Sequence, residues 1–391
     1  MDDRKGPMPR LAGWLHRHFL AVLFASYAAA ALWPGPGLAI RKLSMGQVGL
    51  GSIHTEASLP LLMLACLLFN AGLGVNTSQL GGFMRRPRTL VAGLSANILF
   101  PILFILSISW WMQHWHNLDE AQNILVGLAL VASMPIAGSS TAWSQNADGD
   151  MTLSLSLVLG STFLSPLVTP IALHAVGFVA TGDYSEDLHE LASGHTESFL
   201  AIGVLAPSIL GILAGRLLGP GRVAAAKPYL KLLNSLVLLA LNYSNAAISL
   251  PQAIADPDLD FLMVTFMIVS GLCVLAFAVG WGLARLLVAG RDQQIALMFA
   301  LGMNNNGTGL VLASMAMADH PRVMLPIIFY NMVQHLVAGG AYSLIGRRSG
   351  PHGEGSASSV RKTVVLSAVA ADHTVLAAHD PDRRAASLRH A

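Results

Sequence analysis

The sequence has little charge. Asp, Glu, Lys and Arg together make up 11% of the 391 residues, whereas a soluble globular domain carries about 25%. Hydrophobic residues reach 54%, and the mean hydropathy is +0.58. This balance excludes an ordinary soluble domain and indicates an integral membrane protein. No basic run with interleaved aromatic residues suggests nucleic-acid binding.

The sequence also lacks the motifs of covalent, metal and nucleotide chemistry. Its two cysteines, Cys66 and Cys273, lie in apolar segments, so we expect small hydrophobic side chains and no disulfide framework. It has no G-x-S-x-G and no G-x-x-x-x-G-K-[ST] motif, and His189-Glu190 has no second histidine at the zinc spacing. We therefore expect no enzyme, no nucleotide-driven pump and no cofactor.

Long apolar segments are what the sequence does have. About 20 apolar residues cross a bilayer as a helix, and ten segments approach that length. They are residues 18–34, 57–76, 89–113, 121–147, 151–176, 198–218, 228–252, 261–288, 292–317 and 322–346. We therefore predict an all-α membrane protein of about ten transmembrane helices.

The connections between these segments alternate in charge. The basic ones are the N-terminus, Arg85 to Arg88, Arg216 to Lys231, Arg285 with Arg291, and the tail after Arg347. The acidic ones are Asp119-Glu120, Asp183 to Glu197 and Asp256 to Asp260, and the exceptions are Arg41-Lys42, Asp148 and Asp150. Because basic connections stay in the cytoplasm, we expect a plasma (inner) membrane protein with both termini cytoplasmic.

The N-terminus fits two interpretations. Arg4, Lys5, Arg10 and Arg17 precede the apolar run 19–33, which resembles a signal peptide as well as a first membrane helix. We favour the membrane helix because the orientation and the repeat both require it.

Ten spans divide into two units of five, and an odd unit inserts in opposite orientations, so an inverted repeat is expected. The predicted parts are a cytoplasmic N-terminal segment (1–17), a first repeat (18–180), an acidic external loop (181–197), a second repeat (198–346) and a disordered cytoplasmic tail (347–391). The tail is rich in Gly, Ser, Ala and charged residues, without periodicity.

Two polar stretches interrupt the apolar pattern, one in each half. Residues 302–309 read Gly-Met-Asn-Asn-Asn-Gly-Thr-Gly, and residues 135–141 read Pro-Ile-Ala-Gly-Ser-Ser-Thr. An unpaired polar group in lipid costs several kcal/mol, and glycine weakens a helix by about 1 kcal/mol. We expect both helices to break at membrane depth beside a wet cavity. Paired broken helices are typical of a secondary transporter's binding site.

Other polar residues have structural interpretations. Ser161, Thr162, Ser165 and Thr169 fit back-bonding to helix carbonyls or small-residue packing. Asp150 fits a helix N-cap better than an ion ligand, and His335 fits a packed histidine as well as a binding residue. The three consecutive carboxamides 304–306 point in different directions around a helix, so packing on one neighbour does not satisfy them.

These motifs resemble the bile acid:sodium symporter family, in particular its bacterial members, from about Leu61 to Gly339. The resemblance rests on Phe299-x-x-Gly302-Met303-x-Asn305-x-Gly307, on Asp148-Gly149-Asp150-Met151-x-Leu153-Ser154, on Ser161-Thr162…Ser165-Pro166…Thr169-Pro170, and on Pro135…Ser140. Members carry organic anions with sodium. The resemblance implies panel and core domains, with spans four and nine unwound and crossing in the core.

The resemblance also implies site residues. The implied sodium ligands are Ser140, Thr141, Ser154, Asn304, Asn97 and the main-chain carbonyls of Leu301 and Met303. The implied substrate-binding residues are Asn305, Asn306, Gln334 and His335. Ala300 and Val158 stand where the family has a ligating Glu and Thr, so one sodium site loses its carboxylate. The second sodium site keeps more of its ligands.

The expected function is secondary active transport, namely sodium-coupled symport of an organic anion, a small carboxylate or related amphipathic anion, by alternating access. The alternatives are an uncoupled or proton-coupled anion facilitator or channel, which Ala300 and Val158 favour, and a membrane sensor with a transporter-like fold. The expected partners are the anion, sodium and the lipid bilayer, with no nucleic acid.

Overall fold

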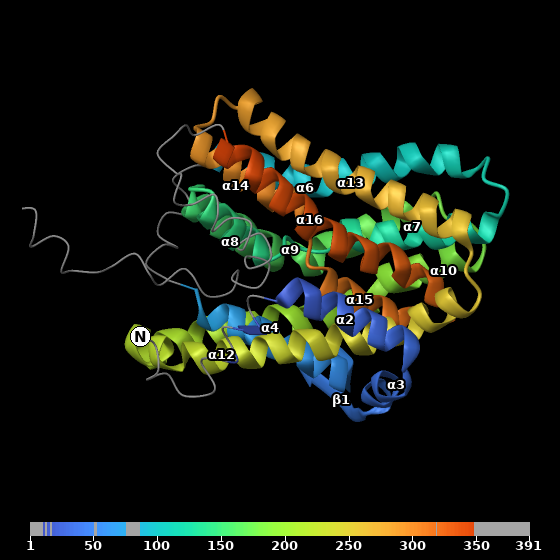
Figure 1. Cartoon of the computed structure of the whole chain (residues 1–391), viewed down its shortest axis with the longest axis horizontal. Coiled ribbons are helices and arrows are strands. Elements are labelled where there is room, and N and C mark those ends of the chain that lie inside the picture. Colours follow the sequence, from blue (N-terminus) through green and yellow to red (C-terminus); the bar gives the residue numbers. More distant parts are fainter. Residues whose placement is uncertain are drawn as a thin grey trace, which may run out of the picture.

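The computed structural model describes residues 11, 14–15, 18–50, 53–75, 87–317 and 319–347. The chain is mostly helical (Figure 1), and each of the ten apolar segments has a helical counterpart. The helices of the first half are α2 (Phe19–Leu32), α3 (Gly35–Lys42), α4 (Leu59–Leu73), α6 (Pro87–Met112), α7 (Leu118–Ser133), α8 (Ser139–Asn146) and α9 (Met151–Gly177). The long helices of the second half are α12 (Ala206–Ala255), α13 (Leu259–Leu286), α14 (Arg291–Gly302), α15 (Asn306–Ala316) and α16 (Met324–Arg347). The short helical turn η3 (Pro321–Val323) directly precedes α16. Residues 1–10 of the predicted N-terminal segment and the predicted tail beyond residue 347 lie outside the described residues.

Fewer than ten of these helices are long enough to cross a membrane unaided. Five qualify by length and composition, namely Pro87–Met112, Met151–Gly177, Thr196–Ala255, Leu259–Leu286 and Pro321–Ile345. A sixth is counted if the two helices α2 and α3, which meet at an 89° bend, form one span. The count differs from ten because two predicted spans are broken, α4 is short, and α12 joins two predicted spans.

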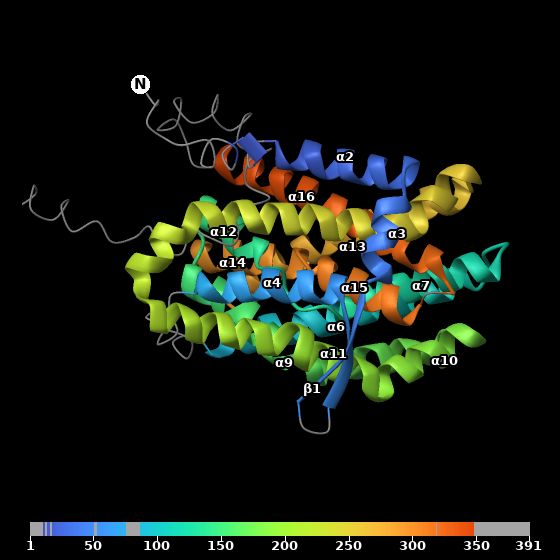
Figure 2. The ribbon, with the colours of Figure 1, turned by 90° about the horizontal axis from the view of Figure 1, so that it is seen from below.

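Alpha12 contains a chain reversal rather than one straight helix. Gly219 has φ 78° and ψ 158°, a left-handed conformation that glycine adopts without steric cost. Figure 2 shows the two parts of α12 running in opposite directions with α4 between them. The predicted boundary between spans six and seven therefore lies at a glycine turn.

Two connections have regular secondary structure. Residues 44–58, which lie largely between two predicted spans, form an antiparallel hairpin of β1 (Ser44–Leu50) and β2 (Ile53–Ser58). Residues 181–197, expected as a loop, are largely helical, as α10 (Asp183–Glu190), a π-helical turn (Leu191–His195) and α11 (Thr196–Leu200). A second π-helical turn (Ala201–Leu205) continues α11 into α12. Acidic side chains at a helix start favour helix formation by interacting with its dipole, and α10 begins with Asp183.

Several helices begin at a side-chain cap. Asn117 accepts a hydrogen bond from the Asp119 amide before α7, and Asp150 accepts one from the Leu153 amide before α9. Asp258 caps α13 in the same way. These caps satisfy amides that have no intrahelical partner, so Asp150 has the structural role that its sequence position predicts.

The helices pack in two groups. Alpha12 packs against α2, α3 and α4, and we call these four helices the α12 bundle. The remaining membrane helices, α6 to α9 and α13 to α16, pack mainly against one another, and we call them the break bundle. Figure 1 shows the α12 bundle as the lower layer and the break bundle above it.

Glycines let the α12 bundle pack at close range. A Cβ on Gly72 of α4 would lie against the carbonyl oxygen of Ser208 and 3.0 Å from the Cα of Gly211. Close backbone approach through small residues is the usual way in which membrane helices associate. The α12 bundle therefore has a rigid centre where α4 crosses α12.

Candidate functional site

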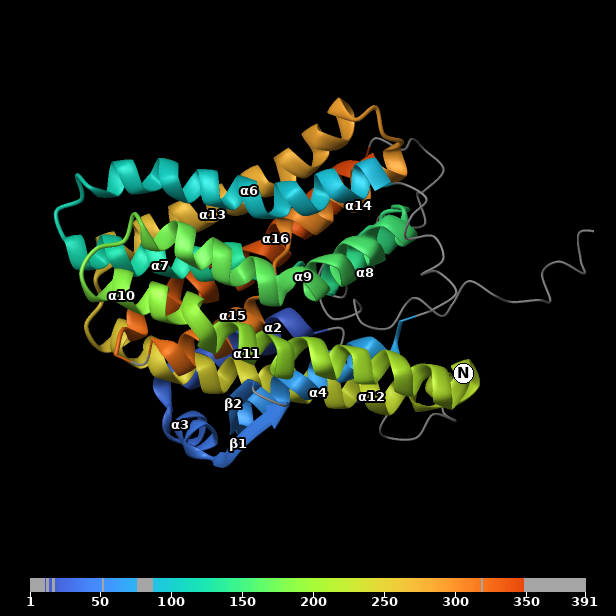
Figure 3. The same ribbon diagram turned by 180° about the vertical axis from the view of Figure 1, so that it is seen from behind.

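The two interrupted helices cross where their chains unwind. Alpha7 ends at Ser133 and α8 begins at Ser139, while α14 ends at Gly302 and α15 begins at Asn306. Figure 3 shows α7 and α15 towards one end of the molecule and α8 and α14 towards the other. The unwound segments, residues 134–138 and 303–305, therefore lie in the interior between four half-helices.

The two unwound segments hydrogen-bond to each other. The amide of Ala137 donates to the carbonyl of Met303, and the amide of Asn305 donates to the carbonyl of Pro135, both at 2.9 Å. Between these bonds, Ile136 and Asn304 pair as in an antiparallel sheet. Backbone groups that leave a helix inside a membrane need such partners, so each break satisfies the other.

Side chains satisfy the remaining groups at the crossing. The Ile136 amide donates to Ser161 Oγ at 3.0 Å, and the Asn304 amide donates to Gln334 Oε1 at 3.0 Å. The Asn304 side chain donates from Nδ2 to the Val131 carbonyl at 3.0 Å, in the last turn of α7. Asn304 therefore joins the two breaks: its side chain bonds to the end of α7, and its backbone belongs to the unwound segment between α14 and α15.

A cavity of about 210 Å³ lies against this crossing. Its polar lining comprises Ser139, Thr141, Thr162, Ser208, Asn234, Asn242, Asn304, Asn305, Asn306, Asn331, Gln334 and His335. Among the described residues that line it, none is Asp, Glu, Lys or Arg. The cavity therefore offers many neutral hydrogen-bonding groups and no fixed counter-charge.

Two helix N-termini border the cavity. Ser139 begins α8 and Asn306 begins α15, and both residues line the cavity. A helix N-terminus carries roughly half a positive charge and exposes amide donors. This arrangement favours an anionic group over a cationic one at that wall.

Several buried polar atoms near the crossing have no hydrogen-bond partner in the described structure. They are the hydroxyls of Ser140, Ser144, Ser154 and Thr308, Oδ1 of Asn304, both side-chain polar atoms of Asn306, and Nδ1 of His335. Burying an unpaired polar group costs about 1–3 kcal/mol. Polar atoms of this kind are suited to a bound solute or ion.

The four predicted substrate-binding residues share this cavity. Asn305, Asn306, Gln334 and His335 all line it. Asn305 also caps α15, since its Oδ1 accepts from the Thr308 amide at 3.4 Å. The sequence prediction therefore names residues that the structure brings together.

The first predicted sodium site keeps three side-chain oxygens, those of Ser140, Thr141 and Ser154. Ser140 and Ser154 are fully buried with unpartnered hydroxyls, and Thr141 lines the cavity. Ala300 is 0% exposed and packs in an apolar cluster that Val158 also contacts. Among the described residues of that cluster there is no carboxylate, so the cluster offers no charged ligand in place of the missing one.

Two cavities beside the crossing receive the side chains of the second predicted sodium site. Asn304 lines the large cavity with an unpartnered Oδ1, and the Met303 carbonyl accepts the Ala137 amide. Asn97 lines a separate cavity of about 20 Å³ with Ser161 and Ser165. The structure thus brings Asn304 to the large cavity and leaves Asn97 outside it.

Sequence reasoning missed a hydrogen-bond chain between the two bundles. Gln334 donates to Asn331 at 3.3 Å, and Asn331 donates to the Tyr27 hydroxyl at 2.9 Å. Tyr27 on α2 then donates to Asn242 on α12 at 3.3 Å. Asn331 and Asn242 are visible in the sequence as polar residues within apolar spans, but Tyr27 is not distinguished from other aromatic residues.

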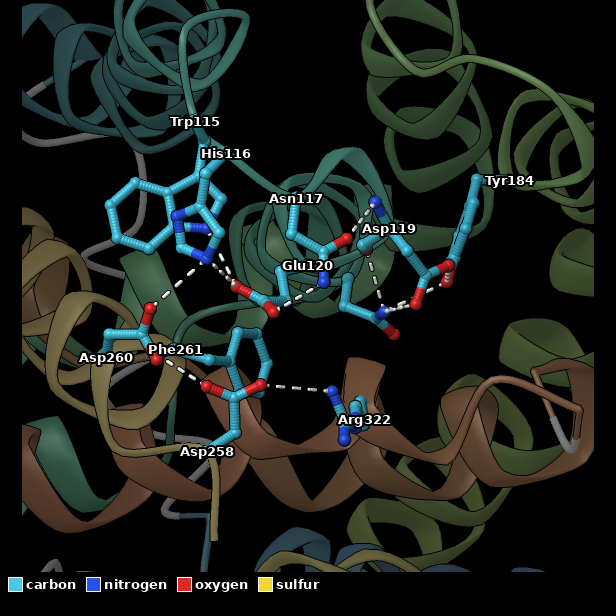
Figure 4. A network of polar contacts seen from close by, with 11 residues as sticks. Trp115, His116, Asn117, Asp119, Glu120, Tyr184, Asp258, Asp260, Phe261 and Arg322 are labelled. Atoms are coloured by element: carbon cyan, nitrogen blue, oxygen red, sulfur yellow. Dashed lines mark hydrogen bonds and ion pairs between the residues drawn. The ribbon is translucent and has the colours of Figure 1, made fainter. Parts of the chain in front are cut away.

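A second polar cluster lies away from the cavity (Figure 4). It includes Trp115, His116, Asn117, Glu120, Asp258, Asp260 and Arg322. His116 Nε2 lies 3.2 Å from Asp260 and 3.9 Å from Glu120, and these three residues place one ligand atom each within 4.8 Å. Both Glu120 oxygens already accept hydrogen bonds. The cluster joins the start of α7 to α13 and to η3.

The hydrogen bond between Asp258 and Asp260 raises the pKa of the Asp258 carboxyl above its ordinary value of 3.8, and partial burial adds to the effect. Arg322 donates to the same carboxyl at 3.5 Å. The hydrogen bond between the two carboxyls therefore favours the protonated form of Asp258, while the contact with Arg322 favours the ionised form.

Two curated relatives match most of the chain. A Bacillus subtilis (strain 168) protein, "Uncharacterized protein YbaS", is 25% identical over 276 residues, which cover 71% of this chain and 85% of that protein. "Uncharacterized sodium-dependent transporter YocS", from the same organism, is 22% identical over 257 residues, 65% of this chain and 73% of its own length. The model of the SBF-like CPA transporter family matches residues 17–341. A match over most of the chain, on a helical protein with apolar spans, shows that the chain belongs to the SBF-like CPA transporter family.

Proposed function

We propose that this protein is a secondary active transporter that moves an organic anion together with sodium by alternating access. The observation that carries the proposal is the crossing of two broken helices whose unwound segments bond to each other at a cavity wall. Broken helices at a central site are how secondary transporters bind solutes and ions. The membership in a transporter family supports the class.

The chemistry of the cavity supports an anion as the solute. The N-termini of α8 and α15 supply partial positive charge, while the carboxamides of Asn305, Asn306 and Gln334 supply neutral donors. The volume of about 210 Å³ falls below the roughly 300 Å³ at which drug-sized sites begin. We therefore propose a small carboxylate rather than a steroid-sized anion.

Oxygen atoms support sodium as the coupling ion. Sodium is a hard cation, and hard cations prefer oxygen ligands. The hydroxyls of Ser140 and Ser154 and the Asn304 Oδ1 are buried and unpartnered. One relative, YocS, is described as a sodium-dependent transporter. We propose the bile acid:sodium symporter type of coupling, with Asn304 as its main side-chain ligand.

The two bundles supply the moving parts. The α12 bundle has the place of the panel domain, and the break bundle has that of the core. In the proposed arrangement ten spans form two inverted five-helix repeats in the inner membrane, with both termini in the cytoplasm. Rocking of the break bundle against the α12 bundle then exposes the crossing to each side in turn.

A second candidate function is an uncoupled or proton-coupled anion facilitator. The observation that favours it is the apolar environment of Ala300 and Val158, because a site without a carboxylate holds sodium more weakly. The two candidates predict the same anion site and differ only in the effect of a sodium gradient.

Uptake of radioactive carboxylates into proteoliposomes tests both candidates. Symport predicts faster uptake with an inward sodium gradient than with an equal potassium gradient. Asn305→Ala should abolish uptake, whereas Ser107→Ala on the exposed face of α6 should not change it. Uptake that sodium does not affect would reject symport in favour of the facilitator. No uptake of any anion by correctly folded protein would reject both and favour a sensor.

A further inference from the structure

Arg41 joins the two bundles at a point that the proposed function does not use. Arg41 lies near the end of α3, and its Nη1 donates to Asn245 Oδ1 of α12 at 2.9 Å. Its Nη2 donates to the Ser314 carbonyl, in the last turn of α15, at 2.8 Å. One guanidinium thus holds a residue of the α12 bundle and the end of a half-helix of the break bundle.

The receiving end of α15 is suited to a cation. Carbonyls of a helix's last turn generally lack intrahelical partners, and this end carries about half a negative charge. A bond from guanidinium to carbonyl is charge-assisted and therefore stronger than a neutral one. Asn245 is fully buried, so the guanidinium reaches into the boundary between the bundles.

Alpha3 is fixed to α12, so Arg41 moves with that bundle. A Cβ on Gly37 would lie 2.7 Å from Ala247 Cβ and 3.3 Å from Ser244 Cα, which shows how closely the two helices approach. The Tyr243 hydroxyl also donates to the Trp33 carbonyl, at the bend before α3. Relative motion of the two bundles must therefore break the bond between Arg41 and Ser314.

The cavity extends towards the other end of the molecule. Its lining includes Gly72, Gly74 and Val75 at the end of α4, and Ile212 of α12 before the Gly219 turn. Figure 2 shows α3 at the opposite end of the α12 bundle from that turn. In the proposed orientation the Gly219 turn is cytoplasmic, since Arg216 and Arg222 flank it, and α3 is external.

We propose that Arg41 is the residue that closes the external side of the transport site. Its guanidinium clamps α3 and α12 to the end of α15 while the cavity faces the cytoplasm. Release of the Ser314 carbonyl lets the end of α15 move away from α12 and opens the external route. This inference rests on the proposed function and orientation, and it assigns a gating role to a residue outside the cavity.

Cysteine labelling tests the gate without substrate or sodium. Leu155, which lines the cavity, becomes the reporter as Leu155→Cys in a background where Cys66 and Cys273 are replaced by alanine. A membrane-impermeant thiol reagent is applied to spheroplasts for the external side and to inverted vesicles for the cytoplasmic side. In the protein with Arg41 intact, the cysteine at position 155 should react quickly from the cytoplasmic side and slowly from the external side. With Arg41→Gln, external labelling should become about tenfold faster, because a charge-assisted bond no longer favours the closed state.

Two further variants make the result specific. Lys42→Gln removes the neighbouring charge, which lies on the exposed side of α3, and should leave labelling unchanged. Arg41→Lys keeps a charge that reaches one acceptor but not both, so it should give a smaller increase than Arg41→Gln. If Arg41→Gln does not reach the membrane intact, Asn245→Ala removes the second acceptor and should also increase external labelling.

The proposed gate is contradicted if external labelling of the Arg41→Gln protein is no faster than that of the Leu155→Cys protein with Arg41 intact. It is also contradicted if Lys42→Gln increases external labelling by the same factor. If Asn245→Ala is the variant used, external labelling no faster than that of the Leu155→Cys protein contradicts the proposed gate in the same way. Failure of the proposed transport function is seen separately, as the absence of anion uptake, because labelling reports only which side reaches the cavity.

Discussion

The amide of Ala137 and the carbonyl of Met303 are 166 residues apart in sequence and form a 2.9 Å hydrogen bond at the centre of the molecule. This bond joins the break in one half of the chain to the break in the other. Neither break is stable alone, because an unwound segment leaves amides and carbonyls without partners. The two interruptions therefore specify each other's position, and the cavity beside them follows from that pairing.

Asn304→Ala should reduce the sodium affinity of the protein. The variant loses Oδ1, the unpartnered oxygen at the cavity, and the bond from Nδ2 to the Val131 carbonyl. We expect the sodium concentration for half-maximal uptake to rise about tenfold, as for the loss of one bond to a charged group. Sodium titration of anion uptake in proteoliposomes measures it.

Asp150→Asn is the matched control for that change. Asp150 caps α9 through the Leu153 amide, and asparagine is an equally good cap, so sodium dependence should change little. An equal loss of sodium affinity in both variants would contradict the assignment of Asn304 as an ion ligand.

Ala300→Glu should make the stability of the protein depend on sodium. Ala300 is fully buried beside Leu301 in an apolar cluster, so a larger side chain costs about 1–3 kcal/mol from overpacking alone. A carboxylate there also needs a partner, and sodium near Ser140 and Ser154 supplies one. We expect a lower Tm in potassium chloride and partial recovery in sodium chloride, measured by thermal unfolding in detergent.

Ala296→Glu provides the comparison, since Ala296 is equally buried in the same cluster, one helical turn earlier. It should be destabilised without recovery in sodium. The same sodium response in both variants would mean that position 300 is not beside a cation site.

The sequence predicts those parts of the fold that depend on local chemistry. Pro135 lacks an amide hydrogen, and Gly302 weakens a helix, so both breaks are visible in the sequence. The cap at Asp150 is visible because aspartate is a preferred N-cap residue. The helical segments are visible because the bilayer demands long apolar runs.

The sequence does not predict the parts that depend on which side chains meet. Asn304 lines the large cavity and Asn97 the small one, and the sequence does not show this, because the register of α6 against the breaks is a tertiary property. The hydrogen bond between Tyr27 and Asn331 spans 304 residues and leaves no local pattern. The β1–β2 hairpin is likewise not predicted by the apolar segments, because most of its residues lie between two of them.

Gly302→Ala should destabilise the crossing more than an ordinary glycine replacement. A Cβ at position 302 would overlap the ring of Phe277, with Cγ only 2.6 Å away. Phe277 is buried against Phe299, so it has little room to move. We expect a loss of about 1–3 kcal/mol in stability, seen as a lower Tm.

Gly271→Ala is the control for Gly302→Ala. A Cβ at Gly271 on α13 would meet no atom within 4 Å. Alanine favours a helix over glycine by about 1 kcal/mol, so this variant should be as stable as the parent or slightly more stable. A Tm for Gly302→Ala at or above that of Gly271→Ala would show that the ring of Phe277 moves aside.

Asp258→Asn should weaken the pH dependence of stability. The hydrogen bond with Asp260 raises the pKa of Asp258 above 3.8 in the folded protein. A carboxyl with a raised pKa stabilises the fold while it is protonated. That contribution is complete below pH 3.8 and is lost as the pH rises through the raised pKa. Asparagine resembles the protonated acid and still caps α13. The Tm of the variant should therefore fall less than that of the parent between acidic and neutral pH. We expect a difference of about 1–2 °C, because the Asp258–Asp260 pair is largely exposed.

The measurement is thermal unfolding in detergent from pH 4 to pH 7, with Asp256→Asn as the control. Asp256 is exposed at the end of α12, so its replacement should leave the pH profile unchanged. The bond between Arg322 and Asp258 opposes the expected effect, because removing the carboxylate also removes a 3.5 Å contact with the guanidinium. That contact is partly exposed and contributes less than about 1 kcal/mol. A steeper fall in Tm towards neutral pH for Asp258→Asn would mean that the contact with Arg322 outweighs the hydrogen bond with Asp260.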